Sequence, residues 1–407
     1  MNSAQRNYYA FLWHATFLAL TVALTEINTV LPSLVVKSGG GTIEIGLLTA
    51  IMVGTPIIGQ LLFASYLHIR PRKRGFLLLG IGLRVTALAT VAGILLVADS
   101  FSSNMLMIFV FVLMFIFALS GTFAGVSYTD ILGKSLAAEQ RGQFFVNRQI
   151  LTSIAFLISA PASRWILGYF DYPVNYSWMF GLASVLLFIA SFGFWVLDEP
   201  HVTPAEETHS FFQVLRAVPR YLKEDRVLFR YILLVNLTGF GLTLMPFYVA
   251  FASRHYGLSG EQVGTYLLVQ IVGMILSNFI WAKMLKSFGF NSVIRGCIIC
   301  GTLLPLLVLG LSGMRLPVFL CVFFLMGVAI SARKIAFDGL LIEITTNTNR
   351  ALYKGIVGTT SLTTAIFPLI AGGLINQLGY LPVFLVVSVL VASAWLTVSA
   401  STVKEEV

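Results

Sequence analysis

Long apolar stretches separated by short polar segments dominate this sequence. Residues 105–119 and 383–398 are apolar on every face, and similar runs recur along the whole chain. A transmembrane helix needs about 20 mainly apolar residues, whereas an outer-membrane strand shows roughly 10 residues in which apolar and polar side chains alternate. The pattern therefore predicts an all-α membrane protein and excludes an outer-membrane barrel.

Glycines, prolines and charges divide the apolar pattern into twelve predicted transmembrane helices. The longest polar interruption separates the first six from the last six, and its second part is typical of an amphipathic interfacial helix. We therefore expect two six-helix bundles, residues 1–197 and 228–407, joined by a cytoplasmic linker, residues 198–227. The predicted spans are residues 8–36, 43–67, 74–98, 103–127, 143–168, 177–197, 228–252, 261–285, 291–312, 316–337, 352–376 and 381–402.

The charged residues indicate orientation. Only 11% of the 407 residues are charged, against roughly 25% in soluble domains. Of the 26 Lys and Arg residues, 21 fall in alternate loops and helix ends on one side, which the positive-inside rule makes cytoplasmic. We expect a multi-pass protein of a bacterial inner membrane with both termini in the cytoplasm. The net charge of +9 then reports orientation, and no nucleic-acid partner is expected.

The sequence lacks the common motifs of enzymes, nucleotide-binding sites and metal sites. It contains no P-loop, no HExxH, no GxSxG elbow and no Cys/His cluster with metal-ligand spacing. We therefore expect no enzyme activity, no cofactor and no metal. Without a Walker sequence, the chain itself cannot hydrolyse ATP, so any transport must be driven by a gradient.

The two halves share an internal repeat. Asp130 precedes Arg141 by 11 residues at the end of the fourth helix, and Asp338 precedes Arg350 by 12 at the end of the tenth. A duplicated six-helix unit is typical of transporters whose solute site lies between the halves, near the bilayer midplane. The halves are therefore expected to act as two rigid bundles.

These features resemble the major facilitator superfamily (MFS) over essentially the whole chain. The resemblance rests on the six-plus-six arrangement, the acid followed by Arg141-Gly142, and the basic cluster Arg70-Pro71-Arg72-Lys73-Arg74 after Gly59. In the family, the signature between the second and third helices usually includes an acid four residues after the glycine. Phe63 occupies that position here. The resemblance implies an MFS fold and transport by alternating access.

Ionisable groups inside a bilayer cost about 2.5–3.5 kcal/mol on insertion scales, so each one needs a cavity, a partner or a function. Glu26 is the only carboxylate well inside a predicted helix, and we interpret it as the proton-coupling group; a structural hydrogen-bonding role is the alternative. Arg333, one turn inside the tenth helix, is a candidate receptor for an anionic solute group. Asn28, Asn236 and Gln270 are candidate solute-binding amides.

Other charges have simpler explanations. Arg84, near the middle of the third helix, is expected to pair with polar groups of neighbouring helices. Arg148 fits an interfacial anchor, and His14 fits an ordinary interface residue. A gating function, through ion pairs that open and close between the bundles, is expected for Arg70, Arg72, Arg74, Asp130, Arg141, Asp338 and Arg350.

The sequence thus predicts a secondary active transporter, proton-coupled and monomeric, for a small organic solute that is anionic or zwitterionic. Its partners are this small-molecule substrate, protons and the lipid bilayer. One alternative is proton-driven efflux of lipophilic or cationic drugs, with Glu26 as the recognition charge. A membrane sensor or a lipid scramblase is the alternative from another class.

Overall fold

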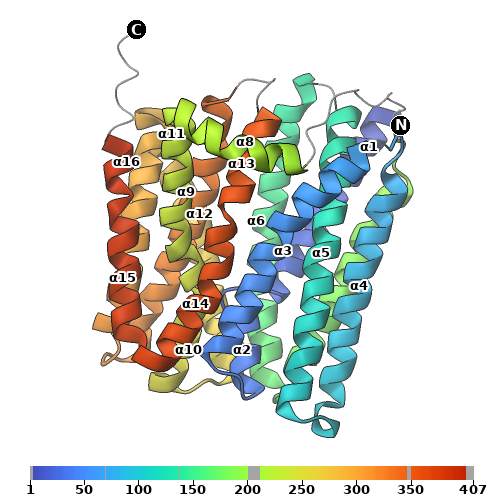
Figure 1. Cartoon of the computed structure of the whole chain (residues 1–407). Helices are drawn as coiled ribbons and strands as arrows, with labels where there is room; N and C mark the ends of the chain where they lie inside the picture. Colours follow the sequence, from blue (N-terminus) through green and yellow to red (C-terminus); the bar gives the residue numbers. More distant parts are fainter. Residues whose placement is uncertain (1–2, 69, 137, 200–210, 346–349, 400–407) are drawn as a thin grey trace. The chain divides into compact units, whose positions relative to one another are not determined.

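A computed structural model describes residues 3–68, 70–136, 138–199, 211–345 and 350–399. These residues form helices and turns, and none of them forms a strand (Figure 1). The first half contains α1 (Ser3–Leu24), α2 (Val30–Lys37), α3 (Thr42–His68), α4 (Arg74–Leu96), the 3-10 helix η1 (Ala98–Ser100), α5 (Ser103–Ser135), α6 (Ala138–Tyr169) and α7 (Val174–Trp195).

The second half begins with the amphipathic helix expected in the linker. Its elements are α8 (Phe211–Glu224), α9 (Arg226–Leu244), α10 (Pro246–Tyr256), α11 (Gly260–Gly310), α12 (Leu316–Glu343), α13 (Arg350–Thr360), α14 (Leu362–Leu378), α15 (Tyr380–Ser393) and α16 (Trp395–Ser399).

The helices are long and apolar, as a bilayer requires. On α5 the side chains of Ile108, Val112 and Phe115 are 60%, 52% and 44% exposed, so apolar residues face outward as well as inward. A helix that is apolar all round suits a hydrocarbon surrounding. The protein is therefore a multi-pass α-helical membrane protein.

Ten helices among the described residues are long and apolar enough to cross a membrane, whereas the sequence predicts twelve spans. One difference arises at Gly289, whose φ of 70° turns the chain between the two spans predicted at 261–285 and 291–312 although α11 runs through both. A side chain at such a φ is strained, so glycine suits this turn. The other arises because the first predicted span is divided into α1 and α2.

The chain divides into two compact units. Unit 1 contains residues 1–39, 51–208 and 259–265, and unit 2 contains residues 40–50, 209–258 and 266–407. Each unit thus includes a short segment from the other half of the sequence: the start of α3 belongs to unit 2, and the start of α11 belongs to unit 1.

In unit 1, α1 packs against α6 and α7, and α4 packs against α5 and α7. Asn7, 2% exposed, joins the start of α1 to the chain after α7, because its amide donates to Asp198 O at 2.7 Å and accepts from Asp198 N at 2.9 Å. Close approach of α1 and α7 depends on Gly193, where a Cβ would lie 2.6 Å from Ala10 O.

Unit 2 has an apolar core between α9, α11 and α12. Tyr231, Ile294 and Phe337 are among its buried members. Trp281 also belongs to it, and its indole nitrogen donates to Val328 O at 3.2 Å. The long helices are thus fixed by apolar packing with a few polar links.

We expect Gly193→Ala to lower the thermal unfolding temperature of the purified protein in detergent. The new methyl group would collide with backbone at Ala10, and overpacking of this kind costs about 1–3 kcal/mol. Gly82→Ala is the matched control, because a Cβ on this α4 residue meets nothing within 4 Å. Equal unfolding temperatures for the two variants would contradict the proposed close contact of α1 with α7.

Candidate functional site

Glu26 lies at the break between α1 and α2, and its carboxylate is fully engaged with the next turn. Oε2 accepts from Asn28 N at 2.8 Å, Thr29 N at 2.7 Å and Thr29 Oγ1 at 2.9 Å. Oε1 accepts from Asn28 Nδ2 at 2.8 Å. The acid therefore satisfies the free N–H groups at the start of α2, where a negative charge also interacts favourably with the helix dipole.

Arg333 bridges α12 to α9 in unit 2. Its guanidinium donates to Val235 O at 3.0 Å and to Thr238 Oγ1, and its Cζ lies 4.7 Å from the centre of the Phe337 ring. The neighbouring Gly239 allows α14 to approach closely, since a Cβ there would lie 2.7 Å from Thr364 Cγ2. Arg333 is thus held by polar groups of α9 inside unit 2.

The two candidate amides of unit 2 have different surroundings. Asn236 on α9 donates to Ile232 O at 2.8 Å and accepts from the exposed Thr363 Oγ1 of α14 at 2.6 Å. Gln270 on α11 is 4% exposed, and its Oε1 is a buried acceptor without a hydrogen bond in the described part of the chain.

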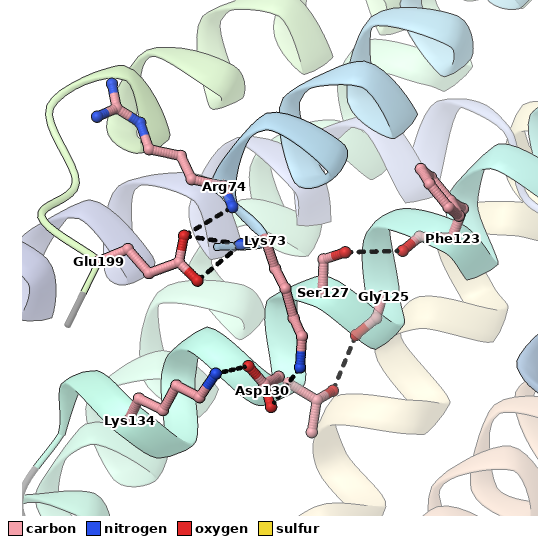
Figure 2. A network of polar contacts seen from close by, with 9 residues as sticks. Lys73, Arg74, Phe123, Gly125, Ser127, Asp130, Lys134 and Glu199 are labelled. Carbon is pink, nitrogen blue, oxygen red and sulfur yellow. Dashed lines mark hydrogen bonds and ion pairs between the residues drawn. The ribbon is translucent and has the colours of Figure 1, made fainter. Parts of the chain in front are cut away.

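Asp130 is the centre of an ion-pair network in unit 1 (Figure 2). Its carboxylate binds Lys73 Nζ at 2.8 Å and Lys134 Nζ at 2.5 Å. The side chain of Lys73 is only 5% exposed, so this ammonium depends on Asp130 for its countercharge. Arg141, the arginine that follows Asp130 in the internal repeat, donates to Gly133 O at 2.8 Å and Leu136 O at 3.2 Å.

Glu199 completes this network from the chain segment after α7. Its carboxylate accepts from Lys73 N at 2.8 and 2.9 Å and from Arg74 N at 2.8 Å, at the start of α4 (Figure 2). An acid at a helix N-terminus accepts hydrogen bonds from the free N–H groups and interacts favourably with the positive end of the helix dipole. Glu199, which lies in the predicted linker 198–227, is therefore a structural acid that caps the start of α4.

The other predicted gating residues are less engaged. Arg70 lies over the Tyr66 ring at 5.1 Å, Arg72 is exposed, and Arg74 donates through Nη2 to Trp195 O. The side chains of Asp338 and Arg350 lie outside the described residues, although both positions are helical. A gating role for this set stays a prediction.

Polar groups also gather inside unit 1 between α1, α4, α5 and α6. Arg84 lies over the Phe117 ring at 4.3 Å, and Arg148 lies 6.0 Å from the centre of the Tyr128 ring. Within the ranges that the structure describes, neither arginine forms an ion pair with an acidic side chain. The same ranges hold no group of three His, Cys, Asp or Glu side chains arranged to bind a metal.

Comparison with known proteins identifies the type of fold. A family model described as Major Facilitator Superfamily matches residues 12–252 and again residues 231–406. No curated protein sequence matches the chain.

Several solved transporters share the fold at low sequence identity. A POT family transporter in complex with 5-aminolevulinic acid has a TM-score of 0.73 and 12% identity, over 98% of this chain and 95% of that one. A mutant of the nucleoside transporter NupG gives 0.71 and 13%, over 98% and 99%. A D-xylose-proton symporter gives 0.68 and 13%, over 96% of each chain.

We expect Asp130→Asn to lower the thermal unfolding temperature, because it leaves the buried ammonium of Lys73 without a countercharge. The expected cost is about 1–3 kcal/mol, as for a buried polar group that loses its partner. Glu224→Gln is the control: its ion pair with Arg220 is exposed, 58% and 76%, and such pairs contribute little. If both variants melt together, Asp130 is not the partner on which Lys73 depends.

Proposed function

This chain belongs to the Major Facilitator Superfamily, and on that premise we propose that it carries a small organic anion or zwitterion across a membrane. The transport is secondary and active, it proceeds by alternating access, and protons are the coupling ion. The bundles 1–197 and 228–407 move about the linker 198–227. Solved transporters of this fold support a small solute and proton coupling, since they include a D-xylose-proton symporter and a complex with 5-aminolevulinic acid.

One observation carries the preference for an anionic group: two half-buried arginines of unit 1 lack an acidic partner among the described residues, whereas the half-buried carboxylate of Glu26 is fully hydrogen-bonded. All four hydrogen bonds of the Glu26 carboxylate go to Asn28 and Thr29, whereas Arg84 and Arg148 make no ion pair among the described residues. An uncompensated cation in the bilayer is expensive. A solute that brings negative charge lowers this cost, and a lipophilic cation raises it.

Glu26 supports proton coupling through its position at the break between α1 and α2. Three of its four hydrogen bonds end on Oε2, which accepts from Asn28 N, Thr29 N and Thr29 Oγ1. A proton on Oε2 would make that oxygen a donor facing these three donors and would weaken the hydrogen bonds. The turn that holds α2 against α1 would then loosen. Proton uptake at Glu26 is thereby linked to a change in the first transmembrane segment.

The second half contributes polar contacts to the solute in this proposal. Arg333 receives an anionic group, Asn236 presents its amide beside Thr363, and the free Oε1 of Gln270 accepts from a solute donor. Asn28 acts through Glu26. The protein works as a monomer in a bacterial inner membrane with both termini in the cytoplasm, consistent with the distribution of Lys and Arg along the sequence.

Gating is proposed for the Asp130 network, with Arg70, Arg72, Arg74, Arg141 and the repeat-related Asp338 and Arg350. The contacts of Asp130 with Lys73 and Lys134 are short and partly buried, they lie within unit 1, and in this proposal they stabilise one conformation of that unit. Their exchange for other partners would accompany a change of state.

The experiment for the transport proposal uses purified protein in proteoliposomes. A thermal-shift screen against carboxylic acids, amino acids, sugars and lipophilic cations first selects a solute. That solute is then tested for counterflow and for accumulation driven by a pH gradient. Saturable counterflow of a carboxylic acid or an amino acid is expected. Accumulation of lipophilic cations alone would support the efflux alternative, and gradient-independent movement of fluorescent lipid would support a scramblase.

Glu26→Gln should abolish accumulation driven by a pH gradient and leave counterflow intact, because the amide cannot exchange a proton. Glu44→Gln is the matched control: Glu44 also caps a helix start, by accepting from Gly41 N at 2.8 Å, but it lies in the first turn of α3. Unchanged driven accumulation in Glu26→Gln would assign the carboxylate to helix capping only.

A further inference from the structure

The interior of unit 1 contains a cluster of polar groups around Tyr128, and the proposed function above assigns its members no contact with the solute. It consists of His14 on α1, Arg84 on α4, Tyr128 on α5 and Arg148 on α6. The rings of His14 and Tyr128 are 5.9 Å apart, and Arg148 Cζ is 6.0 Å from the centre of the Tyr128 ring. Arg84 lies against α5 about two turns before Tyr128, where a Cβ on Gly121 would be 3.2 Å from Arg84 Nε. Four helices thus contribute polar side chains to this part of unit 1.

An aromatic layer supports this cluster. Phe11 and Phe194 are 0% exposed, and their ring centres lie 5.1 and 6.0 Å from that of Tyr128. Phe194 also lies 4.4 Å from the ring of His14, whose Nδ1 is 3.3 Å from Ala190 O on α7. These contacts fix both rings without using the Tyr128 hydroxyl or His14 Nε2.

Two polar groups of the cluster have no hydrogen-bond partner among the described residues. The hydroxyl of Tyr128 and Nε of Arg84 are buried and make no hydrogen bond with any described residue. Arg148 contributes a partly buried guanidinium whose described contact is the Tyr128 ring. Buried polar groups without partners are rare and call for an explanation such as a bound molecule. Their shared property here is the ability to donate hydrogen bonds near positive charge.

We propose that His14, Arg84, Tyr128 and Arg148 form an oxyanion-binding subsite, which holds the carboxylate or phosphate group of a solute. A guanidinium binds such groups through two parallel hydrogen bonds, and the tyrosine hydroxyl adds a single donor, while His14 packs against the tyrosine ring. This inference deepens the proposed function and rests on it for the identity of the ligand as a transported solute. It adds a second position for an anionic group, inside unit 1, besides the one proposed at Arg333 in unit 2.

Tyr128→Phe is the informative substitution because it removes only a hydroxyl that has no partner among the described residues. The ring contacts with Phe11 and Phe194 persist, so the ligand-free unfolding temperature should not fall. Tyr248→Phe is the matched control, since Tyr248 in unit 2 is 0% exposed and its hydroxyl is likewise buried without a described partner. The pair separates loss of a ligand contact from loss of a buried hydroxyl.

Arg148→Gln removes the cation in a second, independent variant. Arg254→Gln is its control, because Arg254 lies over the Tyr380 ring at 5.0 Å in unit 2 and has the same kind of contact. Both substitutions remove one positive charge, so a general electrostatic effect on anion binding would appear in both.

The measurement is the thermal unfolding temperature of the full-length protein in detergent, titrated with sodium benzoate or sodium phosphate against sodium chloride at equal ionic strength and pH. Ligand that binds only the folded state raises this temperature, and the stabilisation grows as the logarithm of 1 + L/Kd, where L is the ligand concentration, so a titration reports the affinity. We expect benzoate or phosphate to stabilise the parent beyond chloride, with about tenfold weaker affinity in Tyr128→Phe and Arg148→Gln, as for a lost hydrogen bond to a charged group. The two controls should match the parent.

Two results overturn the subsite: neither anion stabilises the parent beyond chloride, or the shift is the same in all five proteins. The outcome is separable from that of the transport proposal. Binding with the expected variant pattern but without counterflow would keep the subsite and reject transport of that anion. Counterflow of an anion, with unchanged affinity in Tyr128→Phe and Arg148→Gln, would support transport of that anion and reject the subsite.

Discussion

Lipid offers no hydrogen bonds, so every polar group within the membrane must find a partner inside the protein. This constraint explains where the charges of the chain are placed. Glu26 binds the N–H groups that a helix break exposes, and Glu199 does the same at the start of α4. Arg333 binds a carbonyl and a hydroxyl of α9. In each case a charge is tolerated because the backbone or a neighbouring helix supplies the opposite dipole.

Much of the fold could be predicted because apolar run length and the position of Lys and Arg report it directly. The all-helical class and the family are confirmed by the structure and by the family model. The limits of the twelve spans are harder to predict, since the break at residues 25–29 and the turn at Gly289 are local changes of the backbone. A hydropathy pattern averages over about one span and cannot resolve them.

The candidate site was harder to predict, since its contacts join residues far apart in the sequence. Asp130 and Arg141 are neighbours along the chain, yet Asp130 binds Lys73, which is 57 positions away. Glu199 was interpreted as part of an acidic linker, although its partner is a helix end 126 residues earlier. The depth of Glu26 was visible from sequence, but its four bonds depend on the unwinding of one turn.

The need for every polar group in the membrane to have a partner also applies to the buried groups that have none among the described residues. An unpartnered buried donor costs about 1–3 kcal/mol, which is a large fraction of the stability of a typical folded domain. Tyr128 and Arg84 each retain one such buried donor in unit 1, and the rings of Phe11 and Phe194 pack against the Tyr128 ring rather than its hydroxyl. An apolar or cationic molecule would leave these donors unsatisfied, whereas an oxyanion offers several acceptors and negative charge together. The imbalance of donors over acceptors therefore selects the chemistry of the ligand before its identity is known.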